Sequence, residues 1–94
     1  MALTVDSTGT PVKATGTTSA DQLILKAPMY IKFIHWFNPT AAGHLLALQD
    51  ESGRNIAEIR CESANRSEWA PIWTPFNEVR CDNMDSGTLY IYIS

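Results

Sequence analysis

The sequence predicts an all-β fold, a single small antiparallel β-sandwich of about seven to eight strands. Three observations lead to this prediction. Short runs rich in β-branched and aromatic residues, with apolar and polar residues in alternation, recur along the 94 residues. Turn-forming Gly, Pro, Asn and Asp separate these runs at the spacing expected of a sandwich. No segment has the pattern of a helix. A chain of this length has room for one domain with one core.

The longest apolar run, residues 29–37, predicts a central strand with which other strands pair. Pro28 and the Asn38-Pro39 pair are expected to limit it. Strict alternation sorts its residues into two sides, and large apolar groups occur on both, so each should be at least partly covered. The two expected sides are Met29, Ile31, Phe33, His35 and Phe37, and Tyr30, Lys32, Ile34 and Trp36.

The N-terminal segment, residues 1–19, is rich in Thr and offers large apolar surface only at Leu3, Val5 and Val12. We therefore expect an extended arm or an edge strand ahead of a sandwich domain at 20–94, and as a sharper alternative an arm that pairs with a neighbouring subunit's sheet edge. On the arm interpretation, its deletion should leave the melting temperature of the domain nearly unchanged.

The rest of the chain divides into short strands. The clearest turn is Asp50 to Arg54, a type I turn with Gly53 at the position that needs positive φ. Two prolines in residues 69–76 predict an edge strand, or a wall across one end of the sandwich. The remaining expected strands are 21–26, 44–49, 55–62, 77–82 and 88–93, the last with Leu89, Ile91 and Ile93 inward and Tyr90 and Tyr92 outward. Jelly-roll-like and immunoglobulin-like arrangements both stay open.

Charge and cysteine content exclude several classes of function. The formal net charge of −3 and a pI near 5.1 argue against a nucleic-acid partner, which requires clustered Lys and Arg. Neither a secretory signal nor an apolar run long enough for a membrane helix is visible, so we expect a soluble chain made in a cytoplasm, with no membrane partner. Cys61 and Cys81 are expected to be reduced and buried, with a disulfide as the alternative.

No residue pattern predicts catalysis, a metal or a cofactor. The only histidines are His35 and His44, and we interpret His35 as a core or interface residue because its strand is apolar. A zinc site made of both histidines with Cys61 and Cys81 would match no known ligand spacing. We therefore expect a protein that is not an enzyme.

The aromatic residues are the best candidates for function. There are more large rings than the outer faces of so small a monomer should carry, and exposed aromatic patches mark interfaces. Core filling at the ends of the sandwich and a sugar-stacking platform are the alternatives. The candidate interface residues are Trp36, Trp69, Trp73, Tyr90 and Tyr92, together with Leu3 and Val5 of the N-terminal segment.

Over residues 20–94 the chain resembles small all-β virion structural proteins of tailed bacteriophages. The resemblance rests on the Thr/Ser-rich arm, the strand at 30–36, the Ala-Ala-Gly loop at 41–43, the turn at 50–53 and the terminal run at 85–93. It implies a capsid decoration or cement protein in the virion, with the major capsid protein as partner and no catalytic residues. A homo-oligomer is expected, with a trimer as the first candidate. The alternative is a receptor- or carbohydrate-binding module at the tail or head surface.

Overall fold

The computed structural model describes residues 3–6, 11–18 and 22–93, and their regular structure is entirely β. Seven strands of these described residues form one antiparallel sheet in the order β1-β2-β7-β3-β6-β4-β5. The strands are β1 (Thr4–Asp6), β2 (Val12–Thr15), β3 (Gln22–Phe37), β4 (Leu45–Gln49), β5 (Asn55–Arg60), β6 (Glu68–Met84) and β7 (Thr88–Ile93). The predicted all-β sandwich is confirmed.

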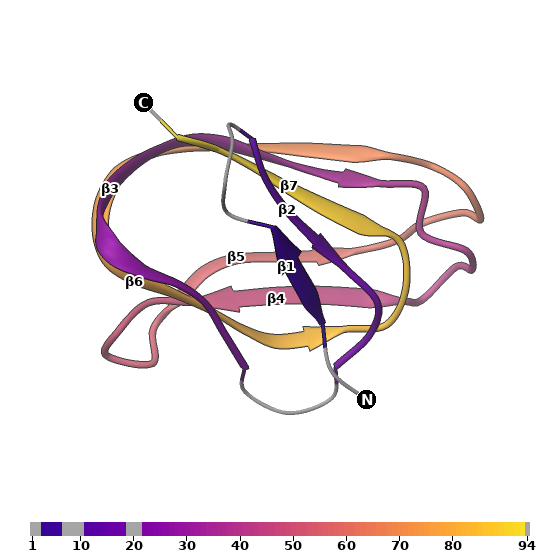
Figure 1. Cartoon of the computed structure of the whole chain (residues 1–94). Helices are drawn as coiled ribbons and strands as arrows, with labels where there is room; N and C mark the ends of the chain where they lie inside the picture. Colours follow the sequence, from indigo (N-terminus) through magenta and orange to yellow (C-terminus); the bar gives the residue numbers. More distant parts are fainter. Residues whose placement is uncertain (1–2, 7–10, 19–21, 94) are drawn as a thin grey trace.

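The sandwich arises because the two longest strands bend together. β3 has 16 residues and β6 has 17, and a straight strand of that length would span about 50 Å. The longest extent of the molecule is only 33 Å. Figure 1 shows the paired strands β3 and β6 curving from one layer into the other, so that β2 and β7 lie in the upper layer and β4 and β5 in the lower one. One folded sheet thus supplies both faces of the core.

The bend is made by β-bulges, in which β3 has one residue more than its partner β7, and β6 has one residue more than its partner β3. Ile31 of β3 pairs with Ile93 of β7 and with Thr74 of β6, and Phe33 pairs with Tyr92 and with Pro71. From the first set of partners to the second, the chain therefore advances by one residue in β7, two in β3 and three in β6. Bulges of this kind let a strand turn a corner and pass from one sheet layer to the other. Trp73 lies in the β6 bulge with a φ of 51°, a left-handed conformation that is uncommon for a bulky side chain.

The bulge changes which side of β3 faces the core. Met29 and Ile31 are buried before it, and Ile34 and Trp36 are buried after it. The strict alternation expected for residues 29–37 is therefore wrong. One residue inserted at the bend shifts the period-2 pattern by one position, which carries Phe33, His35 and Phe37 to the outer side.

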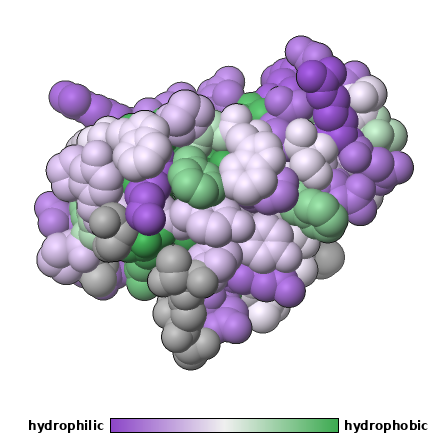
Figure 2. Space-filling model, turned by 90° about the horizontal axis from the view of Figure 1, so that it is seen from above, coloured by the Kyte–Doolittle hydropathy of each residue, from purple (hydrophilic) through white to green (hydrophobic). Residues whose placement is uncertain are grey.

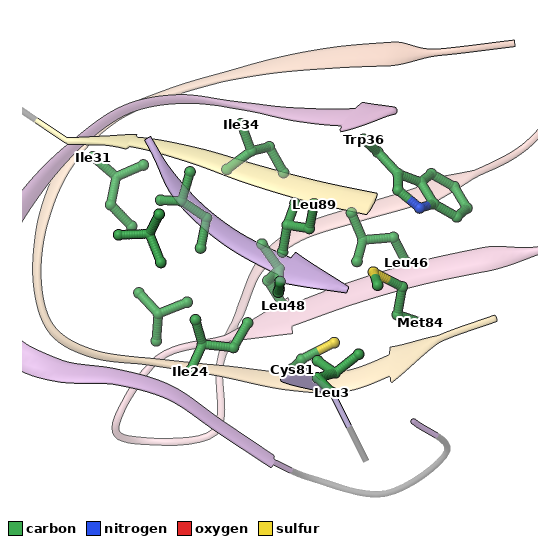
Figure 3. Close-up of a cluster of buried hydrophobic side chains, with 14 of the residues drawn as sticks. Leu3, Ile24, Ile31, Ile34, Trp36, Leu46, Leu48, Cys81, Met84 and Leu89 are labelled. Atoms are coloured by element: carbon green, nitrogen blue, oxygen red, sulfur yellow. The ribbon is translucent and has the colours of Figure 1, made fainter. Parts of the chain in front are cut away.

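The core lies between the two layers, as Figure 3 shows for its labelled side chains. Ile34, Leu89 and Ile91 point inward from the upper layer and meet Leu46 and Leu48 from the lower one, and all five are at most 1% exposed. Burial of a side chain of this size stabilises the fold by about 1.5–3 kcal/mol. Leu89 and Ile91 face inward in β7 and its tyrosines face outward, as predicted.

The two strands within the described part of the N-terminal segment belong to the sheet. β2 pairs with β7 and β1 pairs with β2, so β1 forms an edge strand. Leu3, Val12 and Ala14 are buried in the core, with 6%, 2% and 0% of their surface exposed. A freely extended arm is therefore not what the described residues 3–6 and 11–18 form. The expected domain boundary at 19/20 lies outside the described residues.

The proline-containing segment also joins the sheet, as the first half of β6. Pro71 pairs with Phe33 and Pro75 with Tyr30. On the side of β6 that faces away from β3, β4 pairs only from Arg80 onward. Among the described residues, no strand therefore lies beside the proline-containing half of β6 on that side. Proline is tolerated at such an edge because its missing N–H is not needed there. The edge-strand prediction for residues 69–76 therefore agrees with the pairing.

The turn between β4 and β5 has the predicted chemistry. Gly53 has a φ of 83°, and its N–H donates to the carbonyl oxygen of Asp50 at 3.1 Å. The carboxylate of Asp50 accepts the N–H groups of Ser52 and Arg54 at 2.9 and 3.0 Å. Desolvation raises the pKa of Asp50 somewhat, but these hydrogen bonds and the charge of Arg54 outweigh it and hold the pKa below its ordinary value of 3.8.

Candidate functional site

Six aromatic rings gather on the outer side of the upper layer, and we call this surface the aromatic face. Cross-strand register places them together: His35 lies opposite Trp69 of β6 on one side and opposite Tyr90 of β7 on the other, and Phe33 lies opposite Tyr92. Residues that face each other across strands are close enough for their side chains to interact. The members of the aromatic face are Phe33, His35, Phe37, Trp69, Tyr90 and Tyr92.

The rings pack against one another and form a continuous layer. The imidazole of His35 stacks on the indole of Trp69, with centroids 3.9 Å apart and planes 8° from parallel. The ring of Phe33 stacks on Tyr92 with centroids 4.5 Å apart, and Phe37 meets His35 edge to face at 5.7 Å. Aromatic pairs in these geometries contribute about 0.5–1.5 kcal/mol each beyond their buried area, so the face holds its own shape.

The aromatic face remains open to solvent. Trp69 is 58% exposed and Phe37 is 47% exposed. Figure 2 views the molecule from this side and shows a broad area of apolar and weakly polar side chains, with most strongly hydrophilic residues toward its edges. Soluble monomers rarely expose contiguous apolar surface of this kind unless it binds something. The face is therefore the candidate functional site.

Few charges adjoin the aromatic face. The outward row that contains His35 continues through Tyr90 to Lys13 of β2 and then to Asp6 of β1, which lies opposite Lys13. With strands about 4.8 Å apart, Lys13 lies about 10 Å from His35 and Asp6 lies farther. Glu68, which precedes Trp69, pairs with Arg66, whose Nε lies 3.1 Å from Glu68 Oε2.

His35 is held toward its neutral form. Burial among the rings desolvates the imidazole and lowers its pKa below the ordinary value of 6.5. The imidazole therefore behaves as one more ring of the aromatic face at neutral pH. Its charge can appear only in more acidic solution.

A second polar cluster closes the end of the sandwich around Ser86. The indole Nε1 of Trp36 donates to the backbone oxygen of Ser86 at 2.8 Å. The Ser86 hydroxyl accepts the N–H of Thr40 at 2.9 Å and lies 2.7 Å from Nδ1 of His44. Ser86 is 8% exposed, and these bonds satisfy buried backbone and indole groups that would otherwise be unpaired. We assign this cluster to holding the turn before β7 against the end of β3.

The structure separates the interface candidates that the sequence singled out. Trp69, Tyr90 and Tyr92 come together on the aromatic face, whereas Trp36 is fully buried and Leu3 is 6% exposed, so both belong to the core. Trp36 as an interface residue is thus corrected: the bulge turns it inward and Ser86 satisfies its N–H. Val5 is partly buried against the core. Trp73 is 57% exposed at the bend but takes no part in the ring contacts found among the described residues.

The sequence missed half of the aromatic face. Phe33, His35 and Phe37 were assigned to one side of the central strand together with Met29 and Ile31, which are buried. A possible signal was the apolar character of both expected sides of residues 29–37, which is typical of a strand that changes layers. Without the pairing partners, that signal does not locate the bulge.

Cys61 and Cys81 are buried and form no disulfide, as the reduced interpretation predicted. The thiol of Cys61 donates to the carbonyl oxygen of Ser63 at 2.9 Å. Among residues 3–6, 11–18 and 22–93 there is no pocket, no cluster of three or more residues able to hold a metal ion, and no helix suited to crossing a membrane. Comparison with protein-family models, curated proteins and solved structures finds no match.

Proposed function

We propose that this chain is a virion structural protein of the capsid decoration or cement class, which attaches to the protein surface of the head through its aromatic face. The observation that supports the proposal most strongly is the layer of six packed rings across β3, β6 and β7, of which Trp69 and Phe37 are exposed and the other four are partly exposed. Trp and Tyr are enriched among the residues that carry most of the binding energy in protein interfaces.

The geometry of the rings favours a protein partner over a glycan. A sugar stacks on an open ring face, but in the aromatic face the ring faces lie largely against one another. His35 covers one side of Trp69, and Tyr92 covers one side of Phe33. The surface that remains combines the exposed Trp69 and Phe37 with partly buried tyrosines and a histidine, which suits the mixed apolar and polar surface of a protein interface. The glycan-binding alternative is kept as an outcome of the test.

The test is binding of the purified chain to head particles assembled without it. Trp69→Ala should weaken binding by about 2 kcal/mol or more, since a centrally placed Trp is a typical interface anchor. That loss corresponds to a roughly thirtyfold higher Kd. The folded domain should persist, because Trp69 is 58% exposed and lies outside the core.

Trp73→Ala is the matched control. It removes the same side chain at nearly the same exposure, 57%, from a position outside the ring layer. Binding that falls with Trp69→Ala and not with Trp73→Ala supports the proposal, whereas equal losses would mean that the aromatic face is not the attachment surface.

Particle stability tests the cement role itself. Thermal release of the genome should occur at lower temperature from particles that lack this chain, because a ligand that binds only the intact shell stabilises it. Two results together would replace the proposal with the receptor-binding alternative: identical release curves for particles with and without this chain, and binding of the wild-type chain to a glycan array that Trp69→Ala abolishes.

A further inference from the structure

The position of His35 within the aromatic face has a consequence for the control of attachment. The imidazole lies between the rings of Trp69 and Tyr90 on the neighbouring strands, and Phe33 and Phe37 flank it on its own strand. A partner that docks on the aromatic face must cover His35 together with these rings. The only residue of the face that changes charge between about pH 5 and pH 8 is thus placed at its centre.

We propose that attachment through the aromatic face is pH-dependent, with the partner bound while His35 is neutral and released when His35 takes up a proton. The inference rests on the proposed function and names the regulation of the same surface. No new ligand or co-reactant is required, because the proton comes from and returns to the solvent.

The physical reason is desolvation of a cation without a counter-ion. Covering the face removes water from His35, and burial of an unpaired charge is unfavourable. The charged groups nearest in register do not compensate for it. Lys13, beyond Tyr90, is itself positive, Asp6 is farther away and lies opposite Lys13, and Glu68 pairs with Arg66. Lys13 at about 10 Å, and Asp6 beyond it, are also largely screened at physiological ionic strength.

The isolated domain already shows the same preference on a smaller scale. Partial burial among the rings lowers the pKa of His35, and the cause is loss of hydration. Complete burial under a partner extends that effect in the same direction. Stacking on Trp69 gives an imidazolium some cation–π attraction, but that interaction is available in the free protein too, so it does not favour the bound state.

The experiment measures the Kd of the chain for head particles assembled without it, at about pH 7.5 and about pH 5.5. The wild-type chain should bind several-fold more weakly at the lower pH, but by less than about tenfold, because the pKa of His35 lies below 6.5 and the free imidazole is therefore not fully protonated at about pH 5.5. His35→Gln should bind with nearly the same Kd at both values, because glutamine keeps a polar side chain that does not titrate. His44→Gln is the control, since it removes the other histidine, which lies at the Ser86 cluster away from the aromatic face.

The possible outcomes separate the two proposals. A pH effect present in the wild type and in His44→Gln but lost in His35→Gln supports the inference. Binding that is equal at both pH values, or a pH effect retained in His35→Gln, overturns the inference and leaves the proposed function standing. Absence of binding by the wild-type chain at both pH values overturns the proposed function and the inference with it.

Discussion

Gly87 offers the sharpest test of how the end of the sandwich is closed. It has a φ of 81°, and a Cβ added there would lie 2.8 Å from the backbone oxygen of Phe37 and 2.9 Å from Nε1 of Trp36. Real Cβ atoms essentially never come this close to other heavy atoms. Gly87→Ala therefore requires either the turn before β7 or the end of β3 to move.

Two costs add in Gly87→Ala. An alanine in left-handed backbone costs about 1–2 kcal/mol. Displacement of the turn also pulls the Ser86 carbonyl away from the Trp36 indole, which now donates to it at 2.8 Å in a fully buried site. A buried N–H left without an acceptor costs about 1–3 kcal/mol. The free energy of unfolding should therefore fall by about 2–5 kcal/mol, a large part of the stability of a small domain.

Two other glycines provide matched controls. Gly43 and Gly53 have φ values of 89° and 83°, and a Cβ at either would meet nothing within 4 Å. Alanine at these positions should incur only the backbone cost of about 1–2 kcal/mol. Urea unfolding followed by Trp fluorescence measures all three variants, and the effect of Gly87→Ala should exceed that of each control by about 1–3 kcal/mol.

An equal loss of stability in all three variants would refute this reasoning. It would show that left-handed backbone alone explains the requirement for glycine, and that the contact between the turn and Trp36 adds nothing. A near-ultraviolet circular dichroism spectrum that changes only in Gly87→Ala would agree with a displaced Trp36 ring.

Two further predictions concern the N-terminal strands and the pH dependence of stability. Removal of residues 1–15 should lower the free energy of unfolding by several kcal/mol, at about 1.5–3 kcal/mol for each large buried side chain, because Leu3, Val12 and Ala14 are buried; an unchanged urea midpoint would contradict their place in the core. Asp50 stabilises the native state above its unfolded-state pKa of 3.8, and this stabilisation is lost as the pH falls through the lower folded-state pKa. Asp50→Asn keeps an acceptor oxygen but no titration, so the stability difference between wild type and variant should shrink from neutral pH to about pH 3, and a constant difference would exclude this linkage.

Local features of this chain were predictable because neighbouring residues decide them. The Asp50 to Gly53 turn needs only a carboxylate that caps backbone N–H groups and a glycine at positive φ. β7 needs only the alternation of Leu89 and Ile91 with Tyr90 and Tyr92. The outward position of the tyrosines, and hence one third of the aromatic face, followed from this pattern.

Features that depend on distant pairing were not predictable in the same way. The expected strands 21–26 and 29–37 form the single strand β3, and 69–76 and 77–82 form the single strand β6, because β3 and β6 pair along almost their whole length. The expectation that Pro28 limits the central strand is therefore wrong, since Pro28 lies within β3. The N-terminal segment contains few large apolar residues, yet β2 is held between β1 and β7 and its apolar side chains fill the core. Their burial results from where the segment docks and not from how many of them there are.

The sequence by itself determined the all-β class, the turn chemistry and the outward tyrosines, since periodicity and turn propensity act over a few residues. Only the tertiary structure decided which side of β3 faces the core. β3 has one extra residue near Lys32 relative to β7, and β6 has one extra residue near Trp73 relative to β3. These extra residues form a common bend only when the strands are paired. That pairing shifts the pattern by one residue, sends Trp36 inward to Ser86, and brings Phe33, His35 and Phe37 beside Trp69 to complete the aromatic face.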